Sequence, residues 1–345
     1  MIKKLFPIRK ICLLLILSLL MLSVFGCDVL INNSAMNDGT QISEGTNGAS
    51  EEKLEETEET TIETIIPKNT TDKILVSELP VDFSAPYATY SIINTGAAVF
   101  YKQNTDYIKK DSDKNYVEPK GLVVAVNAGH GTKGGANIKV FSHPDHSPKA
   151  AGGTTEKGEI LSMAVSDGTT LNDGMREAKA NLIIAQRLKD KLLTAGYDVL
   201  MIRDGDDVQL DNIARTSLAN KYADCHVAIH FDYTTSDKGI FYITPTTVES
   251  YLNMEPLRSN RENIDALGKS LIEAFRDIGE KIWKDKGILY GDLTQLSYST
   301  NASVDIELGD RATILTEEKI ERLAEGLKNG IENYLKVYSE AKNEE

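Results

Sequence analysis

The sequence predicts an α/β fold, in the form of a single domain whose twisted, mostly parallel sheet is flanked by helices on both faces. Short apolar runs that suit buried strands alternate with longer segments in which apolar residues recur every three or four positions. Reactive side chains, His130, His230 and Glu307, stand at or near the ends of three apolar runs. Because ligands of such folds bind beyond the carboxyl ends of the strands, a site is expected there.

The predicted strands are short runs rich in valine, isoleucine and other apolar residues. The first, LVVAVN, continues into AGHG, where one histidine stands between two glycines. Cys225 opens an alternating run, CHVAIHF, and is expected to be a small buried apolar residue. The five predicted strands are 122–127, 197–203, 225–231, 239–244 and 303–308.

The predicted helices are amphipathic segments with recognisable ends. The first places Leu182, Leu188 and Leu192 on one face, and a glycine follows its last turn. The last opens with Thr316, and acidic residues follow at 317 and 318, which favours capping and suits the helix dipole. The four predicted helices are 176–196, 210–223, 262–285 and 316–338.

Residues 1–26 predict the signal peptide of a lipoprotein. Basic residues precede an apolar run of about 15 residues, which is short for a membrane span. The run ends in VFGC, which resembles the lipobox of bacterial lipoproteins, so lipidation of Cys27 is expected. The exported chain would then be anchored to the outer face of the cytoplasmic membrane, facing the cell wall. An ordinary signal peptide with an incidental cysteine and an uncleaved anchor are the alternatives.

Residues 27–75 are predicted to form a disordered acidic tether, because they are rich in threonine and glutamate. Eleven acidic residues and three lysines lie between Asp28 and Lys73, so this segment carries more than half of the net charge of −14. Such a composition buries too little apolar surface to offset the entropy of ordering. No basic stripe occurs elsewhere, so nucleic-acid binding is not expected.

Residues 76–119 are rich in aromatic residues and in residues that favour strands. We predict that they form an N-terminal extension of the domain, of uncertain placement.

His130, Glu177 and His230 are candidate metal ligands. Zinc in hydrolases is commonly held by two histidines and one carboxylate, with a position left open for water. Glu177 opens the first predicted helix, where a carboxylate suits the helix dipole. The candidates are 47 and 53 positions apart and share no local zinc motif. By spacing alone, a single strand histidine is more often a hydrogen-bonded core residue.

Five segments together resemble the zinc-dependent N-acetylmuramoyl-L-alanine amidases, which are cell-wall enzymes with an α/β fold. They cover about residues 121–338, and the long loop after His130 contains AGGTT, which is similar to a long-loop clostridial-type variant. The segments are GHG, GMRE, LKDKLLTAGYDVLMIRDGD, IARTSLANKYADCHVAIHFD and VDIELG.

The resemblance implies a catalytic domain over 120–340 that cuts the amide bond between N-acetylmuramic acid and L-alanine in peptidoglycan. It implies one Zn²⁺ ion held by His130, Glu177 and His230. It also implies that Glu307, in IELG, takes a proton from the attacking water and passes it to the leaving amine.

The sequence departs from the family at several positions. Asn127 stands where an acid is usual, and we expect its carbonyl to accept a hydrogen bond from the histidine of the turn. The sequence HPDH at 143–146 is expected to be a turn rather than a second metal site. Arg215 and Asn220 are expected to serve helix packing and capping. DRATI follows IELG where an aromatic and an asparagine are usual, so the substrate groove is expected to differ.

Three other function classes compete with the amidase. A catalytically silent peptidoglycan-binding or regulatory lipoprotein of the same fold is disfavoured by the retained Glu307. A zinc peptidase or deacetylase acting on wall peptides or glycans is disfavoured by the order of the ligands and by IELG. A solute-binding lipoprotein would need two lobes of similar size, and the pattern predicts one.

Overall fold

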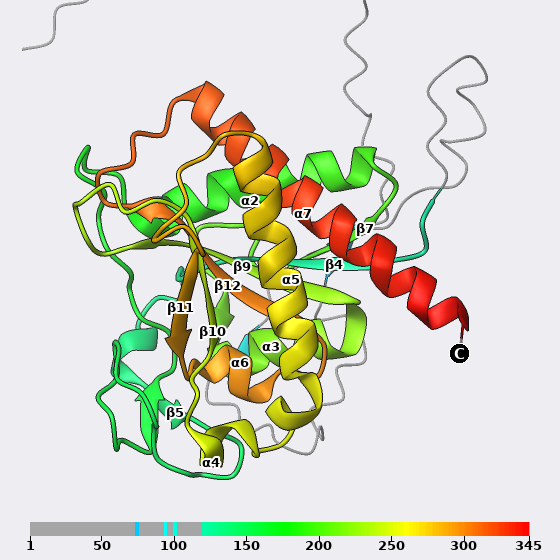
Figure 1. Ribbon diagram of the computed structural model, residues 1–345. Coiled ribbons are helices and arrows are strands. Elements are labelled where there is room, and N and C mark those ends of the chain that lie inside the picture. The colour runs from blue at the N-terminus through cyan, green and yellow to red at the C-terminus, as the bar shows by residue number, and fades with distance from the viewer. Residues whose placement is uncertain (1–72, 76–92, 95–98, 102–118, 345) are drawn as a thin grey trace, which may run out of the picture. The chain divides into compact units, whose positions relative to one another are not determined.

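The computed structural model describes residues 73–75, 93–94, 99–101 and 119–344, all within the unit Thr64–Glu345. The predicted signal peptide, Cys27 and almost all of the predicted tether lie outside the described residues, as does most of 76–119. The described part has a mixed, mostly parallel sheet with helices on both faces (Figure 1), which confirms the predicted fold class.

The central sheet has eight strands in the order β1-β3-β7-β4-β9-β12-β10-β11. Strands β7, β4, β9 and β12 are parallel and form its middle, whereas β3 and β10 pair antiparallel with their inner neighbours. Its members are β1 (Lys73–Leu75), β3 (Val99–Tyr101), β4 (Val123–Ala128), β7 (Asp198–Met201), β9 (Cys225–Asp232), β10 (Phe241–Pro245), β11 (Ile288–Gly291) and β12 (Ala302–Asp310). Two small sheets pair β2 (Ile93–Asn94) with β8 (Gln209–Leu210) and β5 (Lys139–Phe141) with β6 (Leu161–Met163).

All five predicted strands are present, and Cys225 is buried as expected. The edge strand β11 was missed because its four residues, ILYG, are too few and too exposed to show a period. Strand β1 lies in the last three residues of the range predicted as tether, and β3 lies in the 76–119 extension.

The helices are α2 (Glu177–Thr194), α3 (Asn212–Tyr222), α4 (Glu249–Leu252), α5 (Leu257–Asp277), α6 (Thr294–Tyr298) and α7 (Glu317–Glu344), with a 3₁₀ turn η2 (Gly135–Asn137). The helix predicted over 262–285 is wrong in its bounds. It ends at Asp277 because Gly279 follows with φ +76°, which closes the last turn. Ile282 then forms a bridge with Ile240.

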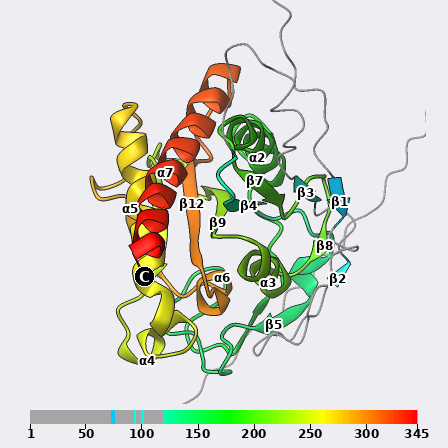
Figure 2. The same cartoon turned by 90° about the vertical axis from the view of Figure 1, so that its right-hand side faces the viewer.

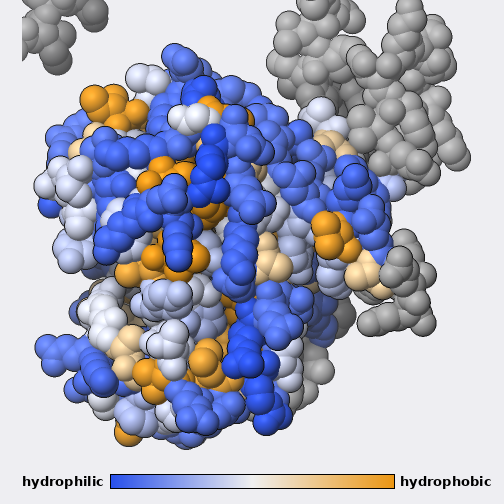
Figure 3. Space-filling model, in the orientation of Figure 1, coloured by the Kyte–Doolittle hydropathy of each residue, from blue (hydrophilic) through white to orange (hydrophobic). Residues whose placement is uncertain are grey.

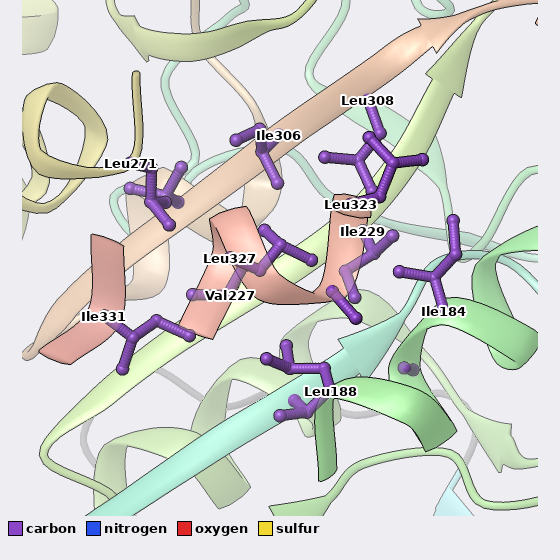
Figure 4. Packing of buried hydrophobic residues seen from close by; sticks show 14 of the residues in the cluster. Ile184, Leu188, Val227, Ile229, Leu271, Ile306, Leu308, Leu323, Leu327 and Ile331 are labelled. Carbon is purple, nitrogen blue, oxygen red and sulfur yellow. The ribbon is translucent and has the colours of Figure 1, made fainter. Parts of the chain in front are cut away.

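One face of the sheet is apolar and packs against α2, α5 and α7. Figure 1 shows α5 and α7 crossing in front of the strands, and Figure 4 shows side chains from the strands and helices interlocking between them. The strands contribute alternate residues to this core, and they meet leucines and isoleucines of the helices. Members of this cluster are Val124, Val126, Val227, Ile229, Val304, Ile306, Ile184, Leu188, Leu271, Leu323, Leu327 and Ile331.

The opposite face of the sheet is more polar and is covered by α3 and α6. Figure 2 shows α2 and α3 on opposite sides of β4. On this face His226 of β9 lies beside Ser303 of β12, and the two share a hydrogen bond of 3.0 Å. Gln295 of α6 donates to Ser303 from above the sheet at 2.9 Å. His226, Ser303 and Gln295 therefore form a chain of buried, hydrogen-bonded polar side chains on this face.

His226 should make the fold sensitive to acid. Burial, with the nearby charge of Arg215, lowers the pKa of His226 to about 3, whereas an unfolded histidine titrates near 6.5. The unfolded chain therefore binds the proton first, and stability is lost as the pH falls from about 6.5 towards 3. Between pH 7 and pH 5 the free energy of unfolding of the metal-free wild type should fall by about 2 kcal/mol more than that of the His226→Gln variant. Urea unfolding at each pH measures this, and two parallel pH profiles would contradict it.

The face shown in Figure 3 is mainly hydrophilic, with apolar side chains in small separate groups. Within the described ranges, none of the helices has the length and apolarity that crossing a membrane requires.

Candidate metal centre

Three predicted site residues from different elements meet at the carboxyl end of the central strands. His130 follows β4, Glu177 opens α2 and His230 lies near the end of β9. His130 Nε2 is 2.8 Å from Glu177 Oε1, and His230 Nδ1 is 3.1 Å from each of these atoms. Over the described ranges, this is the one cluster of histidine, cysteine and acidic side chains arranged to hold a metal ion.

The glycine turn aims His130 at the other two residues. His130 and Gly131 have φ values of 62° and 72°, so the chain reverses at once after the strand. A Cβ atom on Gly129 would lie 2.2 to 2.6 Å from the imidazole of His230. The glycine before the histidine is therefore required because the end of β4 passes directly against the second histidine.

Two buried arginines hold this turn by its carbonyl groups. Arg215 of α3 donates to the carbonyl oxygen of His130 at 2.7 Å, and Arg203 donates to that of Gly129 at 3.1 Å. Burial lowers the pKa of Arg203 to about 10 and that of Arg215 to about 9, so both are charged at neutral pH. Arg215 thus does more than the helix packing expected of it, because it fixes the backbone of a candidate ligand.

The expected role of Asn127 is wrong. Its Oδ1 accepts a hydrogen bond from Arg215 at 3.1 Å, since the side chain lies on the α3 side of the sheet. His130 instead pairs its Nδ1 with the carbonyl oxygen of Ser166 at 2.8 Å. Asn127 therefore reaches the histidine only indirectly, through the arginine.

Hydrogen bonds on the far side of the cluster determine which atoms face inward. Because His130 Nδ1 donates to Ser166, its Nε2 keeps a lone pair directed at the centre. The backbone N–H of Thr169 donates to Glu177 Oε2 at 2.8 Å, which leaves Oε1 towards the two histidines. The end of the long loop after His130 therefore supplies contacts that orient two of the three side chains.

The donor set fits Zn²⁺. Two imidazole nitrogens and one carboxylate oxygen converge, and their lone pairs repel one another unless a cation or a proton lies between them. Burial opposes charge on His230, but Asp305, Glu177 and Glu307 together raise its pKa to about 9. Burial likewise opposes charge on Glu177, but the adjacent imidazoles of His130 and His230 lower its pKa far below the ordinary value. A site that attracts a proton so strongly suits a divalent cation.

Glu307 lies beside this cluster. In the parallel ladder between β12 and β9 it is opposite His230. Its Oε2 is buried and has no hydrogen-bond partner in the described part of the chain. Burial, with the charges of Asp305 and Glu177, raises the pKa of Glu307 well above its ordinary value. A carboxylate kept free of partners beside a metal site is suited to exchanging protons with a bound water.

The segment after IELG builds one rim of the centre. Asp310 is buried and accepts hydrogen bonds from the backbone of Ser236 and Lys238 at 2.8 and 3.2 Å. Arg311 donates to the carbonyl oxygen of Thr170 at 2.8 Å. DRATI therefore ties the loop after β9 and the loop before α2 to the end of β12.

The other candidates have structural roles. In HPDH, His143 Nδ1 shares a hydrogen bond of 2.9 Å with Ser297, and Asp145 accepts from the backbone of Ser147, as in a turn. The expected turn is confirmed. Asn220 donates to the carbonyl oxygen of Tyr298 at 2.8 Å and thereby joins α3 to α6, which confirms its packing role.

Gly129→Ala tests the geometry of the turn. The added methyl group would displace the His230 imidazole, so we expect the affinity for zinc to fall about tenfold or more. Gly153→Ala is the matched control, because a Cβ there meets nothing within 4 Å. Competition with a chromogenic chelator measures both affinities, and equal values for the two variants would contradict the packing described here.

Known proteins resemble the chain in sequence and in fold. The profile of the N-acetylmuramoyl-L-alanine amidase family matches residues 124–333. Among solved structures, the chain is similar to the N-acetylmuramyl-L-alanine amidase Ami1 of Mycobacterium abscessus, with 19% identity, a TM-score of 0.50, and coverage of 62% of this chain and 99% of that chain. It is also similar to Ami1 of Mycobacterium smegmatis, with 18% identity, a TM-score of 0.52, and coverage of 64% and 99%. At these identities the likeness shows a shared fold.

No curated protein sequence matches the chain. The family profile nevertheless covers more than half of it, including all four candidate residues. The chain therefore belongs to the N-acetylmuramoyl-L-alanine amidase family of enzymes.

Proposed function

We propose that the chain is a zinc-dependent hydrolase that cuts the amide bond between N-acetylmuramic acid and L-alanine in peptidoglycan. The observation that carries the proposal is the convergence of His130 Nε2, Glu177 Oε1 and His230 Nδ1 within 3.1 Å of one another. Membership of the amidase family supports the choice of bond.

Each residue has a defined task in this reaction. His130, Glu177 and His230 would hold the ion, and the hydrogen bonds to Ser166 and Thr169 keep two of them in place. Bound zinc supplies a Lewis acid that polarises the amide carbonyl and lowers the pKa of water to about 7.

Glu307 accepts a proton from the water as its oxygen bonds to the carbonyl carbon. It then delivers that proton to the amine of L-alanine as the C–N bond breaks. Burial raises the pKa of Glu307 above its ordinary value, and a stronger proton affinity suits a group that both takes and returns a proton.

We also propose that the chain acts at the membrane surface, where a lipidated Cys27 anchors it and the segment between Cys27 and β1 (Lys73–Leu75) spans the distance to the wall. The support is the VFGC sequence after an apolar run and the acidic composition of the following segment. Labelling of cells with a radioactive fatty acid tests this, because Cys27→Ser should lose the label. A wild-type chain without label would contradict the anchor.

The enzymatic proposal is tested by digestion of purified peptidoglycan with the full chain in detergent. We expect new amino termini to appear, to stop appearing after a chelator is added, and to return with zinc. Peptidoglycan that is bound but never cut at any zinc concentration would instead indicate a silent binding lipoprotein.

A further inference from the structure

We propose that Asp305 is a positioning residue for the metal centre, which holds His230 in the orientation and tautomer that zinc needs. This inference rests on the zinc centre proposed above. Asp305 is separate from the three candidate ligands and from Glu307, and it acts through His230.

The two nitrogens of His230 have different surroundings. Nδ1 faces His130 and Glu177 at 3.1 Å, so this is the atom that a metal would use. Nε2 points the other way and lies 3.6 Å from Asp305 Oδ2. This separation is a few tenths of an ångström longer than a hydrogen bond, and a small rotation of either side chain closes it. With a metal on Nδ1, the proton of the ring is on Nε2 and faces the carboxylate.

The sheet places Asp305 where this contact is possible. Asp305 and Glu307 are two positions apart on β12, so they lie on the same face as His230 of β9. Ala228, which is opposite Asp305 in the ladder, has only a methyl group. Its small side chain leaves the space between the carboxylate and the imidazole open.

Asp305 is expected to lower the stability of the fold. It is 8% exposed, and its Oδ1 has no hydrogen-bond partner among the described residues. A buried carboxylate without full pairing destabilises a protein. Its neighbours Val304 and Ile306 point to the apolar face, where they pack in the core. Fold stability therefore gives no reason for an acid at this position, whereas the imidazole beside it does.

The two histidines are held by partners of different strength. His130 donates to a neutral carbonyl group of Ser166, whereas His230 faces a carboxylate. A carboxylate behind a histidine fixes its ring and makes the opposite nitrogen a better metal ligand, and its loss typically costs about 10- to 100-fold in metal affinity. Asp305 should contribute to zinc affinity by this amount.

The test is zinc binding by the full chain in detergent, measured by competition with a chromogenic chelator. Asp305→Leu should bind zinc about 10- to 100-fold more weakly than wild type. The zinc affinity of Asp305→Asn should lie between those of wild type and Asp305→Leu. The amide oxygen of the asparagine can still accept a hydrogen bond from His230 Nε2, but it carries no charge. Ser303→Ala is the matched control, since it removes a buried polar group from the same face of β12, two residues farther from His230.

The outcomes separate this inference from the proposed function. A wild-type chain that binds no zinc would contradict the metal centre itself. A wild type that binds zinc and an Asp305→Leu variant that binds it equally well would contradict only the role of Asp305. An Asp305→Leu variant that has lost activity but keeps wild-type zinc affinity would also overturn the inference, and it would indicate that Asp305 takes part in catalysis, as Glu307 does. If Asp305→Leu does not fold, by circular dichroism, the same comparison is made with Asp305→Asn.

Discussion

Glu307→Gln is expected to lower kcat by about 10²- to 10⁴-fold and to leave zinc affinity close to that of wild type. Glutamine has the shape of glutamate but cannot accept a proton from the attacking water. Because Glu307 is not one of the three residues whose ligand atoms converge on the centre, the ion should still bind. Activity on peptidoglycan at saturating zinc and zinc affinity by chelator competition are the two measurements.

Glu318→Gln is the control for this variant, because Glu318 is exposed in the first turn of α7. It should have wild-type activity. A Glu307→Gln enzyme within threefold of wild type would show that proton transfer depends on another group, and it would remove Glu307 from the mechanism.

Glu177→Gln is expected to lower zinc affinity by at least about 100-fold, beyond the loss typical of a residue that acts through a ligand. The amide keeps the shape of the side chain, but it removes the negative charge on which both histidines converge. Activity should fall in parallel with bound zinc, in contrast to Glu307→Gln, which should lose activity alone.

Glu156→Gln is the matched control, because Glu156 is exposed in the long loop that also supplies Ser166 and Thr169. Metal content after dialysis and the activity of the same samples give the comparison. Wild-type zinc content in Glu177→Gln would contradict its role as a ligand.

The fold class could be predicted because the middle of the sheet is parallel and buried on both sides. Strands of this kind are continuous apolar runs, and amphipathic helices separate them in the sequence. The position of the site followed from the same logic, because His130, Glu177 and His230 all lie at the carboxyl ends of parallel strands or at the start of the helix that follows. The identity of the ligands depended on the family motifs, since their spacing alone did not single them out.

Other parts left no signal in the sequence. Ser166 and Thr169 orient the site through a backbone carbonyl and a backbone N–H, groups that almost every residue type has. The bounds of α5 depended on where Gly279 closes its last turn, because apolar spacing continues beyond it. Asp305 did have a signal, namely a second acid two positions before Glu307 in the same short strand, but only the structure shows that it faces His230.

The identity of the bond that is cut distinguishes an amidase from the other zinc hydrolases. The most direct test is mass spectrometry of the products released when the zinc-loaded full chain digests purified peptidoglycan. The proposed amidase activity predicts stem peptides with a free L-alanine amino terminus and glycan strands with an unsubstituted lactyl group. Products cut within the peptide stem, or glycans that have lost acetyl groups, would contradict it and would indicate a zinc peptidase or a deacetylase built on the same centre.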